Sequence, residues 1–233
     1  MNISNVLNSP ILHQTERYAE LEQLVMESQG IPKMVHASVF DDFSREDASI
    51  LMVKHGIYVF PTYELAEFIS TKIAGRSAIE IGAGNGVMAK HLGITATDSY
   101  SQSPDFRPEA KYAALWQQSQ LMMHTSGNVP VTYGENVLRT EGVAAVIKHR
   151  PEVVLGQFIT HKYRNGDKDG NVFGVEEHKL LKRADYIMIG NLKTHKNKPL
   201  LSVEHEEIEL DGLVTRAAMQ DLNRIFIFKR QGK

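Results

Sequence analysis

The spacing of apolar positions divides the chain into two parts. In residues 1–60 apolar side chains recur every three or four positions, the period of one helix face, as in TERYAELEQLVMES. In SREDASILMVKHG, Ser44 is placed as an N-cap, acids fill the first turn and Gly56 follows the last. We therefore expect residues 1–60 to form an N-terminal helical extension.

Residues 61–233 follow a different pattern, in which short apolar runs alternate with helical segments. A helix over PTYELAEFISTKIAG, with Pro61 at its start and Gly75 just past its end, comes first. Such alternation predicts an α/β fold with a doubly wound, mostly parallel, seven-stranded sheet. The sixth strand carries charges that suit a sheet edge. The expected strands are SAIEIG, ITATD, VPVTYG (129–134), PEVVLGQF, DYIMIGN, EHEEIEL and NRIFIFKR.

Composition narrows the class of protein. The 233 residues are 42% hydrophobic and 23% charged, which excludes a disordered or fibrous chain. There is no cysteine, so disulfides, thiolate zinc sites and cysteine nucleophiles are excluded. The net charge of -2 offers no global attraction to nucleic acid or anionic membrane. The chain begins without a signal-peptide pattern and has no apolar run long enough to span a bilayer, so a cytoplasmic protein is expected.

A glycine turn follows the first expected strand. In IEIGAGNG, Gly82, Gly84 and Gly86 leave the carboxyl end of the strand, where doubly wound sheets bind ligands. Glycine there lets the backbone approach a ligand closely. The dinucleotide fingerprint G-x-G-x-x-G would need a third glycine where Val87 stands, and that side chain would crowd a pyrophosphate.

Two acids beside this turn indicate the charge of the ligand. Glu80 lies just before the turn, where it would repel phosphates and attract a cation or hydroxyls. Asp98 ends the second expected strand, where an acid commonly accepts from ribose hydroxyls. An adenosine with a positively charged tail and no phosphate fits these acids better than NAD does. S-adenosylmethionine is such a molecule.

The segment AIEIGAGNG resembles the first motif of class I S-adenosylmethionine-dependent methyltransferases, and the chain is similar to uncharacterised bacterial and phage members. The resemblance implies a Rossmann-like fold, an enzyme, and S-adenosyl-L-methionine as cofactor. The segment between Gly86 and Asp98 is about one helical turn shorter than usual, so its helix should be short. The implied cofactor-binding residues are Glu80, Gly82, Ala83, Gly84, Gly86, Asp98, Glu135, Asn136 and Gln157.

The family keeps catalytic residues after the fourth strand, and here that segment reads FITHKYRNGD. His161, and His195 after the fifth strand, are candidate general bases, and Tyr163 is a candidate for positioning the substrate. Each of these histidines could equally be an exposed loop residue. Gln157 and Asn191 stand where metal-dependent members would have acids, so no metal is expected.

The leading hypothesis is a methyltransferase acting on an unidentified acceptor, with a small molecule slightly favoured over nucleic acid and no membrane partner. The alternatives are a non-catalytic S-adenosylmethionine-binding regulatory protein and an NAD-dependent oxidoreductase. Lys193, Lys196 and Lys198 in KTHKNK could hold an anionic group or form a solvated loop. The resemblance also implies that residues 1–60 act as a lid on a Rossmann-like domain of residues 61–233.

Overall fold

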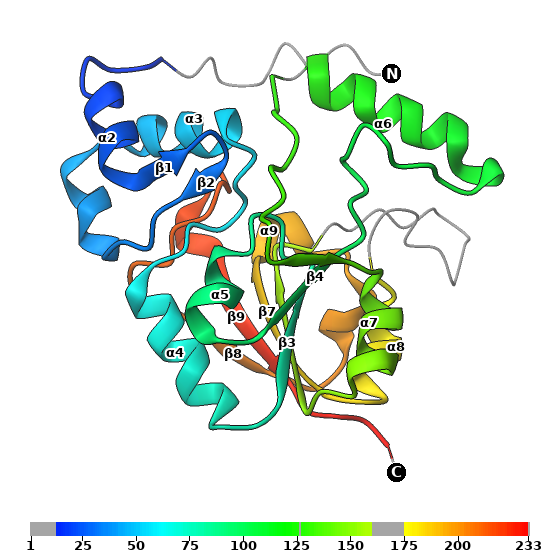
Figure 1. Cartoon of the computed structure of the whole chain (residues 1–233). Coiled ribbons are helices and arrows are strands. Elements are labelled where there is room, and N and C mark those ends of the chain that lie inside the picture. The colour runs from blue at the N-terminus through cyan, green and yellow to red at the C-terminus, as the bar shows by residue number, and fades with distance from the viewer. Residues whose placement is uncertain (1–12, 126, 160–174, 233) are drawn as a thin grey trace.

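A seven-stranded sheet runs through the middle of the computed structural model, which describes residues 13–125, 127–159 and 175–232 (Figure 1). The strand order is β5-β4-β3-β6-β7-β9-β8. Neighbours from β5 to β7 pair in parallel, and β9 pairs antiparallel with both β7 and β8. The strands are β3 (Ala78–Ile81), β4 (Thr95–Asp98), β5 (Val137–Arg139), β6 (Val153–Gln157), β7 (Asp185–Asn191), β8 (Glu206–Ile208) and β9 (Asn223–Phe228).

This arrangement confirms the expected Rossmann-like, mostly parallel sheet, with the charged β8 at one edge as predicted. The prediction of the third strand over 129–134 is wrong, since the strand that pairs with β4 is β5. Val131 N–H donates to Gln102 Oε1 at 3.0 Å, and Gly134 N–H donates to the Gly84 carbonyl at 3.3 Å. The backbone of 129–134 is therefore bonded to loops beside the glycine turn, and Pro130 has no N–H for a ladder.

Helices cover both faces of the sheet (Figure 1). Helices α4 (Tyr63–Ile73) and α5 (Val87–Leu92) cover one face, and α7 (Gly142–His149) and α8 (Glu177–Leu181) cover the other. The six residues of α5 agree with the short helix expected after the glycine turn. Beyond the carboxyl ends of the strands lie α6 (Ala113–Thr125) and α9 (Leu192–His195). Short 3-10 helices span Ala37–Asp42, Ala110–Tyr112, Pro199–Ser202 and Gln220–Leu222.

The central strands are buried on both faces, which explains their continuous apolar runs. In β6, Val153 and Leu155 pack into the cluster beneath α4, whereas Val154 between them packs into the cluster beneath α7. The same alternation divides the buried residues of β7 between the two clusters. These two cores hold the strand ends in fixed positions at the edge where the pocket forms.

The N-terminal part packs beside the carboxyl ends of the strands and has a core of its own, which includes Leu21, Met52 and Phe60. Its elements are α2 (Tyr18–Val25), β1 (Met26–Ser28), β2 (Ile31–Pro32) and α3 (Arg45–Lys54). The predicted cap is confirmed, because Ser44 Oγ accepts from Asp47 N–H at 3.0 Å. The β1–β2 hairpin was not expected from the helical pattern. The division at residue 60 and the lid role stay predictions.

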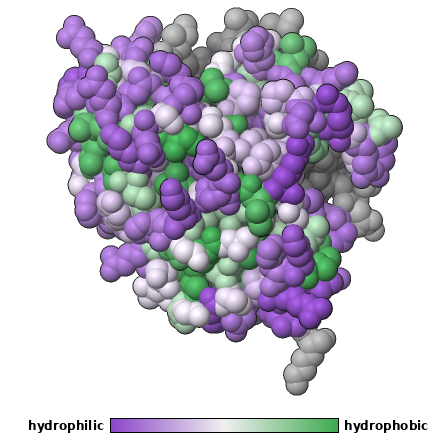
Figure 2. All heavy atoms as spheres, in the orientation of Figure 1, coloured by the Kyte–Doolittle hydropathy of each residue, from purple (hydrophilic) through white to green (hydrophobic). Residues whose placement is uncertain are grey.

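Backbone hydrogen bonds join this N-terminal part to the rest of the chain. Phe60 N–H donates to the Val214 carbonyl at 2.9 Å, and Arg216 N–H donates to the Tyr58 carbonyl at 3.1 Å. On the face shown in Figure 2, apolar residues form small groups separated by hydrophilic ones, so this face carries no large docking surface. Within the three described ranges, no helix has the length and apolar character needed to cross a bilayer.

Candidate functional site

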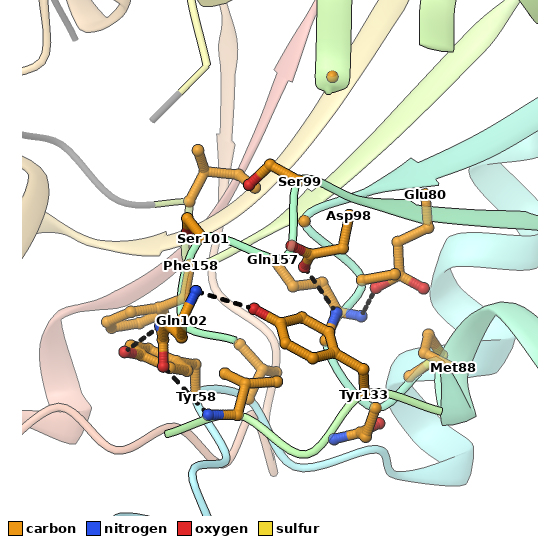
Figure 3. A pocket seen from close by; sticks show the side chains of 18 of the residues that line it. Tyr58, Glu80, Met88, Asp98, Ser99, Ser101, Gln102, Tyr133, Gln157 and Phe158 are labelled. Atoms are coloured by element: carbon orange, nitrogen blue, oxygen red, sulfur yellow. Dashed lines mark hydrogen bonds between the residues drawn. The ribbon is translucent and has the colours of Figure 1, made fainter. Parts of the chain in front are cut away.

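A pocket lies at the carboxyl ends of β3, β4 and β6. The chain leaves β3 towards β4 on one side, while β6 pairs with β3 on the other, so this is a topological switch point of the sheet. The pocket encloses about 1000 Å³ including its open mouth. Its walls come from the turn after β3, the segment after β4, loop 129–134 and the end of β6, with Tyr58 from the N-terminal part (Figure 3).

The glycine turn brings backbone to the pocket wall. Gly84 has a φ of +55°, and a Cβ added there would lie 3.1 Å from Val131 Cγ1. A side chain at this position would therefore be strained and would also crowd the pocket. Asn85 Oδ1 accepts from Val87 N–H at 3.1 Å at the start of α5. That side chain therefore engages one of the N–H groups that a phosphate at the start of α5 would use.

Glu80 supplies a buried carboxyl group on the floor of the pocket. Its side chain is 1% exposed, and Oε1 accepts from Gln157 Nε2 at 2.5 Å (Figure 3). Among the described residues, the other oxygen, Oε2, is buried and makes no hydrogen bond of good geometry. Burial raises the pKa of Glu80 to about 8, although the Gln157 amide and the nearby Ala89 backbone N–H oppose this shift. A cationic group that reached Oε2 would satisfy this atom and favour the ionised form.

Asp98 lies at the end of β4 and holds the glycine turn. Oδ2 accepts from Gly84 N–H at 3.0 Å, and Oδ1 accepts from Tyr100 N–H at 2.9 Å. Burial raises the pKa of the Asp98 carboxyl above its ordinary value, although these backbone donors oppose the shift. The Ser99 backbone N–H also interacts with this carboxyl. A carboxylate accepts about four hydrogen bonds, so acceptor capacity remains for a ligand hydroxyl. The Tyr133 ring, stacked on Tyr100 with centroids 3.9 Å apart, forms the adjoining wall.

The charges around the pocket are of one sign. Among its described lining residues the ionisable side chains of Asp, Glu, Lys, Arg and His are Glu80, Asp98 and Glu141, and none of them is basic. Glu141 caps α7 by accepting from Ala144 N–H at 3.0 Å. A ligand carrying phosphates would meet three acids and no cation, whereas a cationic ligand would be attracted. In the described ranges, no group of three or more His, Asp or Glu side chains could hold a metal ion.

The structure brings most of the predicted cofactor residues together. Three of them do not line the pocket. Glu135 is exposed, and Asn136 Nδ2 donates to the Gly86 carbonyl at 3.0 Å, so Asn136 and Gly86 support the turn from outside. The predicted residues that line the pocket are Glu80, Gly82, Ala83, Gly84, Asp98 and Gln157.

The candidate catalytic residues are placed less completely, because His161 and Tyr163 lie outside the described residues. His195 is buried, and its Nδ1 lies 3.0 Å from Asn191 N. Nδ1 also lies 3.2 Å from the Asn191 carbonyl oxygen, so the backbone of Asn191 engages this ring nitrogen in either neutral tautomer. The geometry therefore favours His195 as a wall residue, whose ring stands edge-on to Phe158 at 4.8 Å.

The lysines of KTHKNK are separated in the structure. Lys198 is buried and its Nζ lies 2.5 Å from Glu177 Oε2, so it belongs to an internal ion pair. Lys193 and Lys196 are exposed. The three lysines do not form one anion-binding cluster.

A second pocket adjoins the first and shares a wall with it. Tyr58, Gln102 and Phe158 are among the residues that line both. Phe158 follows β6 with a φ of +52°, a conformation that bulky side chains seldom adopt and that often marks a functional site. The second pocket has about 1260 Å³ of space including its open side, and its other walls come from α6 and residues 216–218.

Sequence reasoning did not find several of these lining residues. Gln102, Tyr133 and Arg216 lie in loops far apart in the chain, and no local motif marks them. The sequence around Glu141 indicates only a helix cap, because Glu141 comes directly before the apolar helix α7.

Comparisons with known proteins find only distant structural similarity. No protein-family model matches the chain, and no curated protein matches it. The Thermoplasma acidophilum 1320 protein is 16% identical over 72% of this chain and 90% of that one, with a TM-score of 0.33. The 23S rRNA methyltransferase ErmE is 12% identical over 73% of this chain and 69% of its own chain, with a TM-score of 0.36. A SAM-dependent methyltransferase from Agrobacterium tumefaciens is 9% identical over 72% of this chain and 61% of its own chain, with a TM-score of 0.33.

With TM-scores this low, these structures say nothing about the chemistry of this chain, and the site residues must carry the functional conclusion.

Proposed function

We propose that this protein is an S-adenosylmethionine-dependent methyltransferase. The observation that carries the proposal is the charge of the first pocket, whose described lining residues include three acids and no basic side chain, with a buried oxygen on Glu80 that lacks a hydrogen-bond partner among them. S-adenosylmethionine carries a sulfonium and an ammonium, and no phosphate. Its positive charges match an acidic pocket at the switch point, where NAD would bring two phosphate charges instead.

Different residues of the first pocket bind different parts of the cofactor. The open backbone at Gly82, Ala83 and Gly84 accepts the methionine part, and Glu80 Oε2 faces its positive charge. Asp98 accepts from the ribose hydroxyls through its remaining acceptor capacity. The apolar wall formed by Val131 and Tyr133 takes the adenine ring.

Methyl transfer requires a nucleophile in line with the sulfonium carbon. The bound cofactor supplies the electrophilic methyl group. Tyr58, Gln102 and Phe158 line both pockets, which supports a role for them between cofactor and acceptor. Gln102 Nε2 donates to Tyr58 Oη at 3.2 Å, and its Oε1 accepts from Val131 N–H at 3.0 Å. These hydrogen bonds hold the Gln102 side chain in one orientation at the shared wall.

The two alternatives differ in testable ways. An NAD-dependent oxidoreductase would need a site for two phosphates, and the described lining residues of the first pocket include three acids and no basic side chain. A non-catalytic S-adenosylmethionine-binding protein would share the first pocket and differ only by the lack of turnover. Cofactor binding therefore separates the first alternative from the proposal, and an acceptor assay separates the second.

Isothermal titration with S-adenosylmethionine, S-adenosylhomocysteine and NAD tests the proposal. We expect binding of the two adenosyl ligands and none of NAD. Gly84→Val should abolish this binding, because it strains the turn and fills the pocket. Gly93→Val is the matched control, since Gly93 also has a positive φ of +67° but faces open space. NAD binding alone, or equal adenosyl binding by both variants, would contradict the proposal.

A further inference from the structure

The second pocket differs from the first in charge. Among its described lining residues the charged side chain is Arg216, with His195 as the other basic group, and no acid lines it. The remaining lining groups are aromatic, aliphatic, hydroxyl and amide side chains, including Trp116, Met123 and Ser119. An acidic pocket and a pocket with a cation thus lie on either side of one wall.

Arg216 is fixed at this wall from several directions. Its backbone N–H donates to the Tyr58 carbonyl at 3.1 Å, and its guanidinium carbon lies 4.2 Å from the centroid of the Tyr58 ring. Nη2 donates to Asn128 Oδ1. These contacts hold the guanidinium plane in one orientation, so the group is ordered before a ligand arrives.

The guanidinium still lacks a partner for its charge. Nη1 is buried and has no hydrogen-bond partner among the described residues. No Asp or Glu in the described part of the chain forms an ion pair with Arg216, although twelve other ion pairs are present there. A buried donor of a charged group without a partner is costly, and an anion that accepts from it would remove that cost.

We infer that the second pocket holds the methyl acceptor, and that Arg216 binds an anionic group on it, a carboxylate or a phosphate. This inference rests on the proposed function. One cation in an otherwise uncharged pocket fits a small molecule with a single anionic group and an apolar or aromatic body. A nucleic-acid strand would need a row of cations along its phosphates, and the lining residues contain no such row.

The single tryptophan of the chain reports directly on this pocket. Trp116 lines it, and its Nε1 donates to the Ser101 carbonyl at 3.0 Å. Ligand binding is therefore measured by tryptophan fluorescence of the full chain saturated with S-adenosylhomocysteine. The probes are benzoate, phenyl phosphate and, as a neutral match for benzoate, benzamide. A response to benzoate or to phenyl phosphate tells which anion the site prefers.

We expect at least one anionic probe to change the fluorescence at millimolar concentration, and benzamide to bind at least tenfold more weakly than benzoate. Arg216→Gln should weaken binding of the anionic probes by roughly 10- to 100-fold, the effect of a lost charged hydrogen bond. Arg183→Gln removes the same charge from an exposed position outside both pockets and should bind like the wild type. Binding of S-adenosylhomocysteine should be unchanged in both variants, which also shows that they fold.

Three results would overturn the inference. The first is that no anionic probe binds, or that benzamide binds as well as benzoate. The second is that Arg216→Gln binds the anions as tightly as the wild type. The third is that Arg216→Gln loses S-adenosylhomocysteine, which would assign Arg216 to the carboxylate of the cofactor. Failure of the proposed function is distinguishable, because the wild type would then not bind the adenosyl ligands at all.

Discussion

Replacing Glu80 with glutamine tests the electrostatics of the cofactor pocket. Burial raises the pKa of Glu80 from its ordinary 4.5 to about 8 in the folded chain. Between these two pH values the folded state holds a proton that the unfolded state releases, so stability falls as the pH rises from 4.5 to 8. At pH 7 the difference of 2.5 units from 4.5 corresponds to about 3 kcal/mol. Glutamine has the shape of the protonated acid and avoids this cost.

We therefore expect Glu80→Gln to increase the free energy of unfolding by about 1 to 3 kcal/mol near pH 7, allowing for water at the pocket mouth, and to change it little near pH 5. For a chain of this size the gain corresponds to roughly 2–4 °C in Tm per kcal/mol. Thermal unfolding at about pH 5, 7 and 8 measures it. Glu67→Gln is the control, because Glu67 is an exposed acid on α4 and its loss changes the net charge equally.

The same variant should lose affinity for the cofactor, and the loss should depend on pH. Ionised Glu80 attracts the cation, so binding of S-adenosylmethionine to the wild type should strengthen as the pH rises through about 8. In Glu80→Gln this contribution is absent, and we expect roughly tenfold weaker binding or more at the higher pH. Titration of the cofactor's own groups is common to both proteins and cancels in the comparison. Identical pH profiles, or a variant less stable than the wild type near pH 7, would refute the assignment of Glu80 as a buried, mostly protonated acid.

Three further substitutions test the remaining features. Asp98→Asn should weaken binding of both adenosyl ligands at least tenfold in calorimetry, since it removes acceptor sites for the ribose, and equal affinity would remove Asp98 from the site. Tyr133→Ala should weaken the same binding more than Tyr133→Phe, since the ring and not the hydroxyl forms the wall; equal losses would contradict this. Lys198→Met leaves the Glu177 carboxylate buried and unpaired, so denaturant unfolding should show a loss of about 3 to 5 kcal/mol, with adenosyl binding unchanged in the folded protein. A loss below about 1 kcal/mol would show that the pair is not isolated from water.

Local patterns were sufficient to predict most of the fold. Ser44 was identified as an N-cap because capping needs only neighbouring residues, and the apolar run DYIMIGN coincides with β7. The third strand was missed because VPVTYG has the composition of a strand, but its backbone bonds to Gln102 and Gly84. Those partners are distant in the sequence, and no local pattern reports them.

The candidate site divides in the same way. Glu80, Gly84 and Asp98 were found because they stand at strand ends, and the carboxyl ends of parallel strands meet at one edge of the sheet. Asn136 and Glu135 were placed near the adenine on the basis of the wrong third strand, and the structure puts them outside the pocket. No sequence pattern marks Arg216 as a site residue, because an arginine in a loop is normally a solvated charge.

The sequence by itself determined the class of the fold, the glycine turn and the acidic character of the first pocket, because strand alternation and strand-end residues are local properties. Only the tertiary structure decided what lies opposite that turn. Residues 58 and 216 become neighbours through backbone hydrogen bonds between the N-terminal part and the segment before β9. Burial by distant elements likewise left Glu80 Oε2 and Arg216 Nη1 without hydrogen-bond partners among the described residues. Burial and pairing of a side chain depend on the whole chain. The proposals for the cofactor and for the acceptor both depend on these two atoms.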